Sequence, residues 1–115
     1  MNLNDYQKQA IKTDLLGNGK TVPVTDAAYI AKILGLVGEA GEVAEKYKKI
    51  IRDKEGVVSE VDKQELTKEI GDVLWYVAAL AQYLGVSLED VARANLDKLH
   101  SRKLRGTQHG SGDNR

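Results

Sequence analysis

The chain has no cysteine and no phenylalanine, and its 115 residues include a single proline, Pro23. Without cysteine, a disulfide-stapled scaffold and thiolate metal sites are both excluded. Seventeen basic and seventeen acidic side chains give a formal charge of zero, so no overall field draws the protein toward nucleic acid or an anionic membrane. Any function that depends on charge must therefore be local.

Long apolar runs are also missing from the sequence. The opening stretch lacks the apolar core of a signal peptide, and no run approaches the ~18 residues of a membrane span. We therefore expect a cytoplasmic protein whose partners include neither nucleic acid nor a membrane. The length suits one small helical domain over residues 1–104, followed by a flexible polar tail over residues 105–115.

The scarcity of proline leaves helices free to fill most of the chain. Apolar side chains at helical spacing predict helices over about 4–16 and 25–52, a third that ends at 84, and a fourth over 87–104. The polar residues 53–62 read as a loop or short hairpin. Because no stretch alternates like a strand, the sequence predicts an all-α protein, a bundle of four to five helices.

The predicted helix ends rest on capping residues. Asn4, either Thr25 or Asp26, and Ser87 are suited to N-caps, and Gly85 is suited to the position after a helix C-terminus.

The segment GNGKT, residues 17–21, looks like the end of a phosphate-binding P-loop. The first glycine of that motif would fall on Asp14, however, and the segment lies between helices instead of between a strand and a helix. A P-loop is therefore excluded.

Two segments, EAGEV at 39–43 and EIGDV at 69–73, repeat the order carboxylate, glycine, carboxylate, valine. On a helical projection, the first carboxylate of each segment lies at the edge of an apolar arc, and the second lies about 60° further round. In the second helix the arc is predicted to consist of Leu36, Ala40, Val43, Ala44 and Tyr47. The repeated acidic residues, named motif carboxylates below, are Glu39, Glu42, Glu69 and Asp72.

If the second and third helices pack antiparallel, the motif carboxylates can converge in one partly buried cluster. Two like charges ~4 Å apart repel by roughly 4 kcal/mol at an effective dielectric constant of 20, so the cluster needs protons or a cation. Oxygen ligands without histidine or cysteine favour Mg²⁺, with Mn²⁺ as the alternative. A di-iron site would need Glu-x-x-His pairs, which His100 and His109 do not form.

Four glycines interrupt the same helices, at Gly35, Gly38, Gly41 and Gly71. Each costs ~1 kcal/mol relative to alanine inside a helix. Either close helix packing or a ligand against the backbone would account for the missing side chains.

The segments LGLVGEAGEVAEKYKK (34–49) and KEIGDVLWYVAALAQYLGVSLEDVARANLDKLHSRK (68–103) resemble the MazG-type, all-α nucleoside triphosphate pyrophosphohydrolases. The resemblance covers roughly residues 28–104, with Glu-x-x-Glu followed by Glu-x-x-Asp as the defining motif. It implies Mg²⁺-dependent hydrolysis of a nucleoside triphosphate to monophosphate and pyrophosphate, in the service of removing unwanted nucleotides. It also implies that the metal ligands are Glu39, Glu42, Glu69 and Asp72, and we expect Glu39 or Glu42 to act as the general base.

The resemblance extends to residues that would contact the nucleotide. Asn95, Lys98 and Arg102 share one face of the fourth helix and match positions that approach the phosphates, although a basic, solvated face is the alternative. Tyr76 projects toward the motif carboxylates and would contact the sugar or base, with core packing as the alternative. Trp75 points away from the apolar arc of its helix, which favours a contact with another subunit over base stacking.

Apolar surface in excess of what one small bundle covers predicts self-association, and the resemblance implies a homodimer or a homotetramer built as a dimer of dimers. Two further functions stay open. One is a related all-α pyrophosphatase that acts on phosphoribosyl-ATP or dUTP, and the other is a non-catalytic helical oligomerisation module. The glycine-rich tail is either an arm that closes over substrate or a disordered segment.

Overall fold

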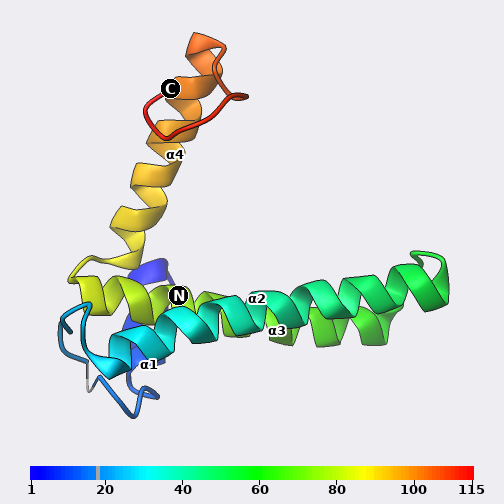
Figure 1. Ribbon diagram of the computed structural model, residues 1–115, viewed down its shortest axis with the longest axis horizontal. Helices are drawn as coiled ribbons and strands as arrows, with labels where there is room; N and C mark the ends of the chain where they lie inside the picture. Colours follow the sequence, from blue (N-terminus) through cyan, green and yellow to red (C-terminus); the bar gives the residue numbers. More distant parts are fainter. Residues whose placement is uncertain (18) are drawn as a thin grey trace.

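The computed structural model describes residues 1–17 and 19–115, so that Asn18 of the GNGKT segment lies outside the described residues. Within these ranges the chain forms four helices and no strand (Figure 1). The predicted all-α fold is confirmed. The helices are α1 (Leu3–Ile11), α2 (Ala27–Lys54), α3 (Glu60–Leu84) and α4 (Leu88–Arg105).

The two long helices, α2 and α3, lie side by side and run antiparallel, as Figure 1 shows. At the end of this pair α3 turns into α4 with a bend of 101°, and α4 projects away from it. The short helix α1 packs on α3 and also contacts α4. Among these helices, as far as the chain is described, α2 and α4 make no contact. Within one chain the two long helices therefore form a pair, and α1 packs on α3 of that pair.

Three of the predicted helix boundaries are confirmed. Asp26 caps α2 by accepting a hydrogen bond from the backbone N–H of Ala28 at 2.8 Å. Ser87 caps α4 in the same way, through the N–H of Asp90 at 3.0 Å. Gly85 ends α3 in the left-handed region, with φ of 82°, which glycine adopts without strain.

The connection between α2 and α3 is shorter than the sequence predicts, since it covers residues 55–59 instead of 53–62. Glu55 adopts the left-handed conformation that ends α2. Ser59 then caps α3 through a capping box with Asp62, so Asp62 lies inside the first turn of α3 instead of in the loop.

The prediction of α1 over 4–16 was wrong at both ends. Asn2 is the N-cap, and the helix ends at Ile11. The chain leaves the helical path because the carboxylate of Asp14 accepts hydrogen bonds from nearby backbone, among them the N–H of Gly17 at 3.1 Å. Such local side-chain acceptors compete with helical hydrogen bonds.

The corner between α3 and α4 is held by buried side chains from α1. The amide of Gln7 donates to the carbonyl oxygen of Val86 at 3.1 Å and accepts from the N–H of Leu88 at 2.9 Å. The indole N–H of Trp75 donates to the hydroxyl oxygen of Thr13 at 2.8 Å. Trp75 therefore packs partly within its own chain, and its contact with another subunit stays a prediction. The small core at this corner contains Ala10, Ala78 and Leu88.

The contact between α2 and α3 follows a heptad-like seam. On each helix, residues that are buried or half-buried recur at alternating spacings of three and four. The predicted apolar arc of α2 was partly wrong, because Ala40, Ala44 and Tyr47 are exposed. Charged residues such as Glu39 and Glu69, which hydrophobicity alone assigns to the edge of the apolar arcs, lie within the contact between the two helices. The seam residues are Tyr29, Lys32, Leu36, Glu39, Val43, Lys46 and Ile50 on α2, with Asp62, Leu66, Glu69, Val73, Tyr76, Leu80 and Tyr83 on α3.

Among the described residues, no single helix is long and apolar enough to cross a membrane. Only α3 and α4 taken together reach that length and composition, and they are bent against each other.

At the end of the seam next to the loop between α2 and α3, an ion pair contributes to the stability of the fold in a pH-dependent way. The ammonium of Lys54 lies 2.7 Å from the carboxylate of Asp62, and Ser59 donates to the same carboxylate from its N–H and its hydroxyl. The hydrogen bond from Lys54, with those from Ser59, lowers the pKa of Asp62 to about 2. This interaction stabilises the fold above the unfolded pKa of about 4 and is lost as the pH falls toward 2.

We therefore predict that Asp62→Asn lowers the Tm at pH 7, and that its Tm approaches that of the wild type as the pH is lowered from about 5 to 2. Thermal melts followed by circular dichroism test this, with Lys54→Met as a matched variant. A Tm difference that stays constant across this pH range would show that the charge of Asp62 does not contribute.

Candidate active site

Three of the four motif carboxylates come together across the seam. Glu39 projects from the middle of α2, while Glu69 and Asp72 lie one turn apart on α3. One carboxylate oxygen from each lies within 4.8 Å of the other two. These three residues are named the carboxylate group below.

Glu42 lies on the same helix as Glu39 but is exposed and falls outside the carboxylate group. Its charge still acts on the group. Burial, followed by the negative charges of Asp72, Glu69 and Glu42, raises the pKa of Glu39. The negative charges within the carboxylate group therefore repel one another.

One lysine offsets part of this charge from the opposite helix. The ammonium of Lys46 on α2 lies 3.2 Å from Glu65 and 3.5 Å from Glu69, both on α3. Its hydrogen bond to Glu65 contributes most to raising the pKa of Lys46. The lysine thus links the carboxylate group to the next turn of α3.

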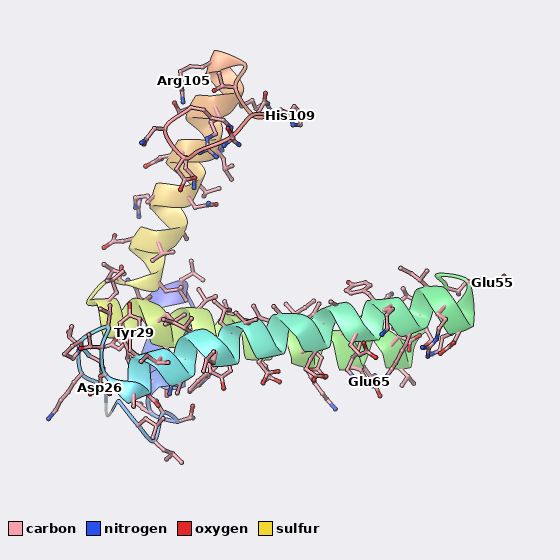
Figure 2. The ribbon with its side chains drawn as sticks, viewed as in Figure 1. Asp26, Tyr29, Glu55, Glu65, Arg105 and His109 are labelled. Carbon is pink, nitrogen blue, oxygen red and sulfur yellow. The ribbon has the colours of Figure 1, made fainter. Side chains whose placement is uncertain are left out.

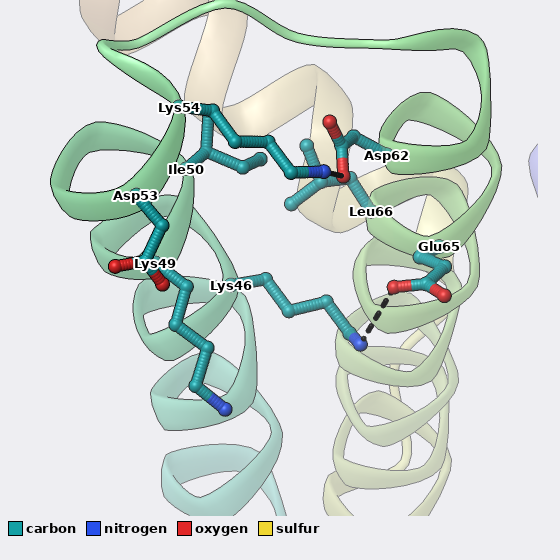
Figure 3. Close-up of a pocket in the computed structure, with 8 residues that line it drawn as sticks. All are labelled: Lys46, Lys49, Ile50, Asp53, Lys54, Asp62, Glu65 and Leu66. Carbon is teal, nitrogen blue, oxygen red and sulfur yellow. Dashed lines mark hydrogen bonds and ion pairs between the residues drawn. The ribbon is translucent and has the colours of Figure 1, made fainter.

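A pocket of about 330 Å³ begins at Lys46 and extends toward the loop between α2 and α3 (Figure 3). Its floor is apolar, because Ile50 and Leu66 are buried there. Charged side chains of both signs form its rim: Lys46, Lys49, Asp53, Lys54, Asp62 and Glu65. Lys46 therefore both lines the pocket and contacts Glu69 of the carboxylate group.

The glycines that interrupt the helices have two different explanations. At Gly35 a Cβ would overlap the ring of Tyr76, so close packing within the chain requires glycine. At Gly38, Gly41 and Gly71 an added Cβ would meet nothing within 4 Å. Close helix approach inside the chain therefore accounts for Gly35 alone among these four.

Tyr76 fills the space beside Gly35 and meets Trp75 edge-on, with ring centroids 4.9 Å apart. Tyr76 is a seam residue, and it lies one helical turn after Asp72 on α3. A packing role within the chain is therefore present, and its contact with the sugar or base stays a prediction.

The structure does not bring Asn95, Lys98 and Arg102 to the carboxylate group of the same chain. They lie on α4, which projects away from the α2–α3 pair; in Figure 2, Glu65 lies along that pair and Arg105 near the far end of α4. Asn95 is exposed, and Lys98 and Arg102 lie 3.3 Å and 3.2 Å from the carboxylate of Asp113. Their phosphate-binding role stays a prediction.

The tail folds back along α4 (Figure 1). Arginine side chains donate hydrogen bonds to its backbone. Arg102 donates to the carbonyl oxygen of Asp113 at 2.9 Å, and Arg115 donates to that of Gln108 at 3.0 Å. Gly106, Gly110 and Gly112 have positive φ angles that allow the reversal. Whether the tail is mobile or closes over substrate stays a prediction.

A buried network near the other end of the seam was missed by the sequence analysis. Lys32 and Asp14, 4% and 6% exposed, form an ion pair of 3.0 Å, and the hydroxyl of Tyr83 donates to Asp14. Burial alone would raise the pKa of Asp14, but the hydrogen bond from Tyr83, with those from backbone and Lys32, holds it below its ordinary value. Lys32 shares the seven-residue spacing of Glu39 and Lys46, which was the available signal.

Comparison with known proteins agrees with this architecture. The family model described as "MazG nucleotide pyrophosphohydrolase domain" matches residues 28–106. The Gene 37 protein of Mycobacterium phage L5 is 48% identical over 116 residues, which cover the whole of both chains. The uncharacterized protein YvdC of Bacillus subtilis (strain 168) is 47% identical over 73 residues, 58% of this chain and 68% of YvdC. No solved structure gives a significant match to the chain.

The family model that matches the chain describes a nucleotide pyrophosphohydrolase domain. The chain belongs to the MazG family, and the resemblance predicted from the sequence is confirmed. The names of the two relatives add nothing about substrate, so the finer assignment rests on the geometry of the site.

The two classes of glycine predict opposite effects of alanine. Gly41→Ala should raise the free energy of unfolding by up to about 1 kcal/mol, because alanine favours the helix and no atom obstructs it. Gly35→Ala should lower it by about 1–3 kcal/mol, because the ring of Tyr76 must move. Urea unfolding of both variants at equal protein concentration measures the difference. Equal stability of the two variants would show that the ring of Tyr76 shifts without cost.

Proposed function

We propose that the chain hydrolyses nucleoside triphosphates to a nucleoside monophosphate and pyrophosphate, with Mg²⁺, or Mn²⁺ in its place, as the cofactor. The observation that carries this proposal is the convergence of Glu39, Glu69 and Asp72 from two helices. Membership of a family of nucleotide pyrophosphohydrolase domains supports the reaction class. Removal of unwanted nucleotides in the cytoplasm is the cellular role that such an activity would serve.

The carboxylate group fits a hard divalent cation. It offers three oxygen ligands within 4.8 Å of one another, and hard cations take all-oxygen ligand sets. Burial and the neighbouring charges that raise the pKa of Glu39 are a cost that a cation would offset. When bound, Mg²⁺ supplies charge neutralisation at the phosphates and a more acidic water.

We assign the role of general base to Glu42. It lies three residues from Glu39 but outside the carboxylate group, so it adjoins the proposed cation site without being one of the three ligands. The attacking water gives its proton to Glu42 and bonds to the α-phosphorus. The bond from the α-phosphorus to the bridging oxygen breaks, and pyrophosphate leaves with that electron pair.

Self-association is part of the proposal, because one chain leaves a wide apolar surface on α2. The outward side chains there are large, aliphatic or aromatic, and more than a third exposed, which is unusual for a monomer. A homodimer or a dimer of dimers would cover them. They are Ile30, Ile33, Leu34, Val37, Tyr47 and Ile51.

Assembly would also account for the predicted phosphate contacts on α4. Since α4 points away from its own carboxylate group, Asn95, Lys98 and Arg102 would serve the site of a neighbouring chain. The projecting direction of α4 and its basic last turn support this arrangement.

Pyrophosphate release from a panel of nucleotides tests the function. The panel holds canonical and modified deoxynucleoside triphosphates, dUTP and phosphoribosyl-ATP, each with and without Mg²⁺ or Mn²⁺. We expect metal-dependent release of equimolar monophosphate and pyrophosphate. Release from phosphoribosyl-ATP alone or from dUTP alone would indicate the related pyrophosphatase. An absence of release with no effect of Mg²⁺ on the Tm would indicate an oligomerisation module.

The separate roles of the two glutamates give a sharper prediction. Glu42→Gln should lower kcat at least about 100-fold through loss of the base, while binding of Mn²⁺ is retained. Glu39→Gln should weaken Mn²⁺ binding as well, because it removes a ligand. Kinetics combined with Mn²⁺ calorimetry distinguish the two, and Glu45→Gln, on the same helix and paired with Lys48, is the matched control. Undiminished turnover in Glu42→Gln would refute its role as base.

A further inference from the structure

Lys46 is the cation nearest to the carboxylate group. Its ammonium lies 3.5 Å from an oxygen of Glu69, and no other ammonium or guanidinium in the described chain forms an ion pair with Glu39, Glu69 or Asp72. It reaches Glu69 from the opposite helix, across the seam. Any cation that binds the carboxylate group must therefore compete with Lys46 for Glu69.

The contact to Glu69 is the weaker of the two that Lys46 makes. The distance to Glu65 is 3.2 Å, within hydrogen-bonding range, and Figure 3 shows the side chain reaching across to Glu65. Like charges that share one carboxylate repel each other. A divalent cation on Glu69 would thus displace the ammonium from Glu69 but leave it anchored by Glu65, which lies outside the carboxylate group.

The displaced ammonium would remain beside the site. Lys46 also lines the pocket of about 330 Å³, so it stands between the carboxylate group and that pocket. Its side chain is 30% exposed, which leaves the ammonium accessible to an anion from solvent. Phosphate oxygens are strong acceptors for such a cation.

We propose that Lys46 is a substrate-binding residue: its ammonium is held by Glu65 and Glu69 until substrate arrives, and then exchanges Glu69 for a phosphate oxygen. The assignment of the anion as a triphosphate rests on the proposed function. Glu65 is the positioning residue that keeps the ammonium at the mouth of the pocket. No covalent bond changes in this exchange. The metal ion replaces the ammonium of Lys46 as the positive partner of Glu69.

A competing role and a purely structural role of Lys46 predict opposite effects of its removal on metal binding. If Lys46 only held Glu69 in place, its removal would weaken metal binding. If it competes for Glu69, its removal strengthens metal binding while it weakens phosphate binding. Exposed ion pairs contribute little to stability, so the variants should fold.

The experiment compares Lys46→Met and Lys46→Arg with Lys49→Met, whose lysine lines the same pocket but pairs with Glu45 on its own helix. Calorimetry measures binding of Mn²⁺ alone, and then of inorganic pyrophosphate to Mn²⁺-saturated protein. For Lys46→Met we expect Mn²⁺ to bind about three- to tenfold more tightly and pyrophosphate about tenfold more weakly. Lys46→Arg and Lys49→Met should stay near the wild type.

With an active nucleotide, Lys46→Met should raise KM about tenfold and change kcat less. Weaker Mn²⁺ binding in Lys46→Met would overturn the proposal in favour of a structural role, and unchanged pyrophosphate binding would overturn the phosphate contact. Both calorimetric results are independent of turnover. A wild type that hydrolyses no nucleotide would therefore refute the proposed function, while the calorimetry still decides the role of Lys46.

Discussion

The structure depends on one constraint, which is that charged side chains buried along the interface between α2 and α3 must be paired. At one end Lys32 of α2 pairs with Asp14 from the segment after α1, and at the other Lys54 of α2 pairs with Asp62 of α3. Between them lies the carboxylate group, with Lys46 as its only ion-pairing cation in the described chain. Because both ends of the seam carry matched charges, the excess negative charge is confined to the middle. The fold thus leaves one stretch of the seam unbalanced, and the proposed cation site rests on this stretch.

The buried pair of Lys32 and Asp14 sets the position of that stretch. Taking two ions out of water is costly, so such a pair is retained only with further partners. Here Tyr83 donates to Asp14, while the ammonium of Lys32 lies 5.4 Å from the ring centroids of Trp75 and Tyr83. The pair joins the segment after α1 to both long helices. Loss of either partner would leave an unpaired buried charge, so the register of α2 against α3 is fixed at this end.

The sequence was sufficient for much of the fold, because caps are local signals. Asp26, Ser87 and Gly85 are found where their chemistry predicts. The end of α1 was not predictable in this way, since Asp14 leaves the helix to meet Tyr83 and Lys32, which are distant in sequence. The prediction of which side chains of α2 face α3 was partly wrong for a related reason. Hydrophobicity places Ala40, Ala44 and Tyr47 inside, whereas ion pairs across the seam bring charged residues there and turn the apolar arc toward solvent.

This rotation separates two tasks on one helix. The side of α2 that faces α3 carries Glu39 and Lys46 between apolar seam residues, and further apolar side chains face outward over several turns. Gly38 and Gly41 leave open space on α2 that no atom of the chain fills, and Gly71 leaves similar space on α3. Inside a helix each of these glycines lowers stability by about 1 kcal/mol relative to alanine. A ligand that approaches the backbone there would account for these glycines, so the residues that weaken the free chain support a site completed by substrate.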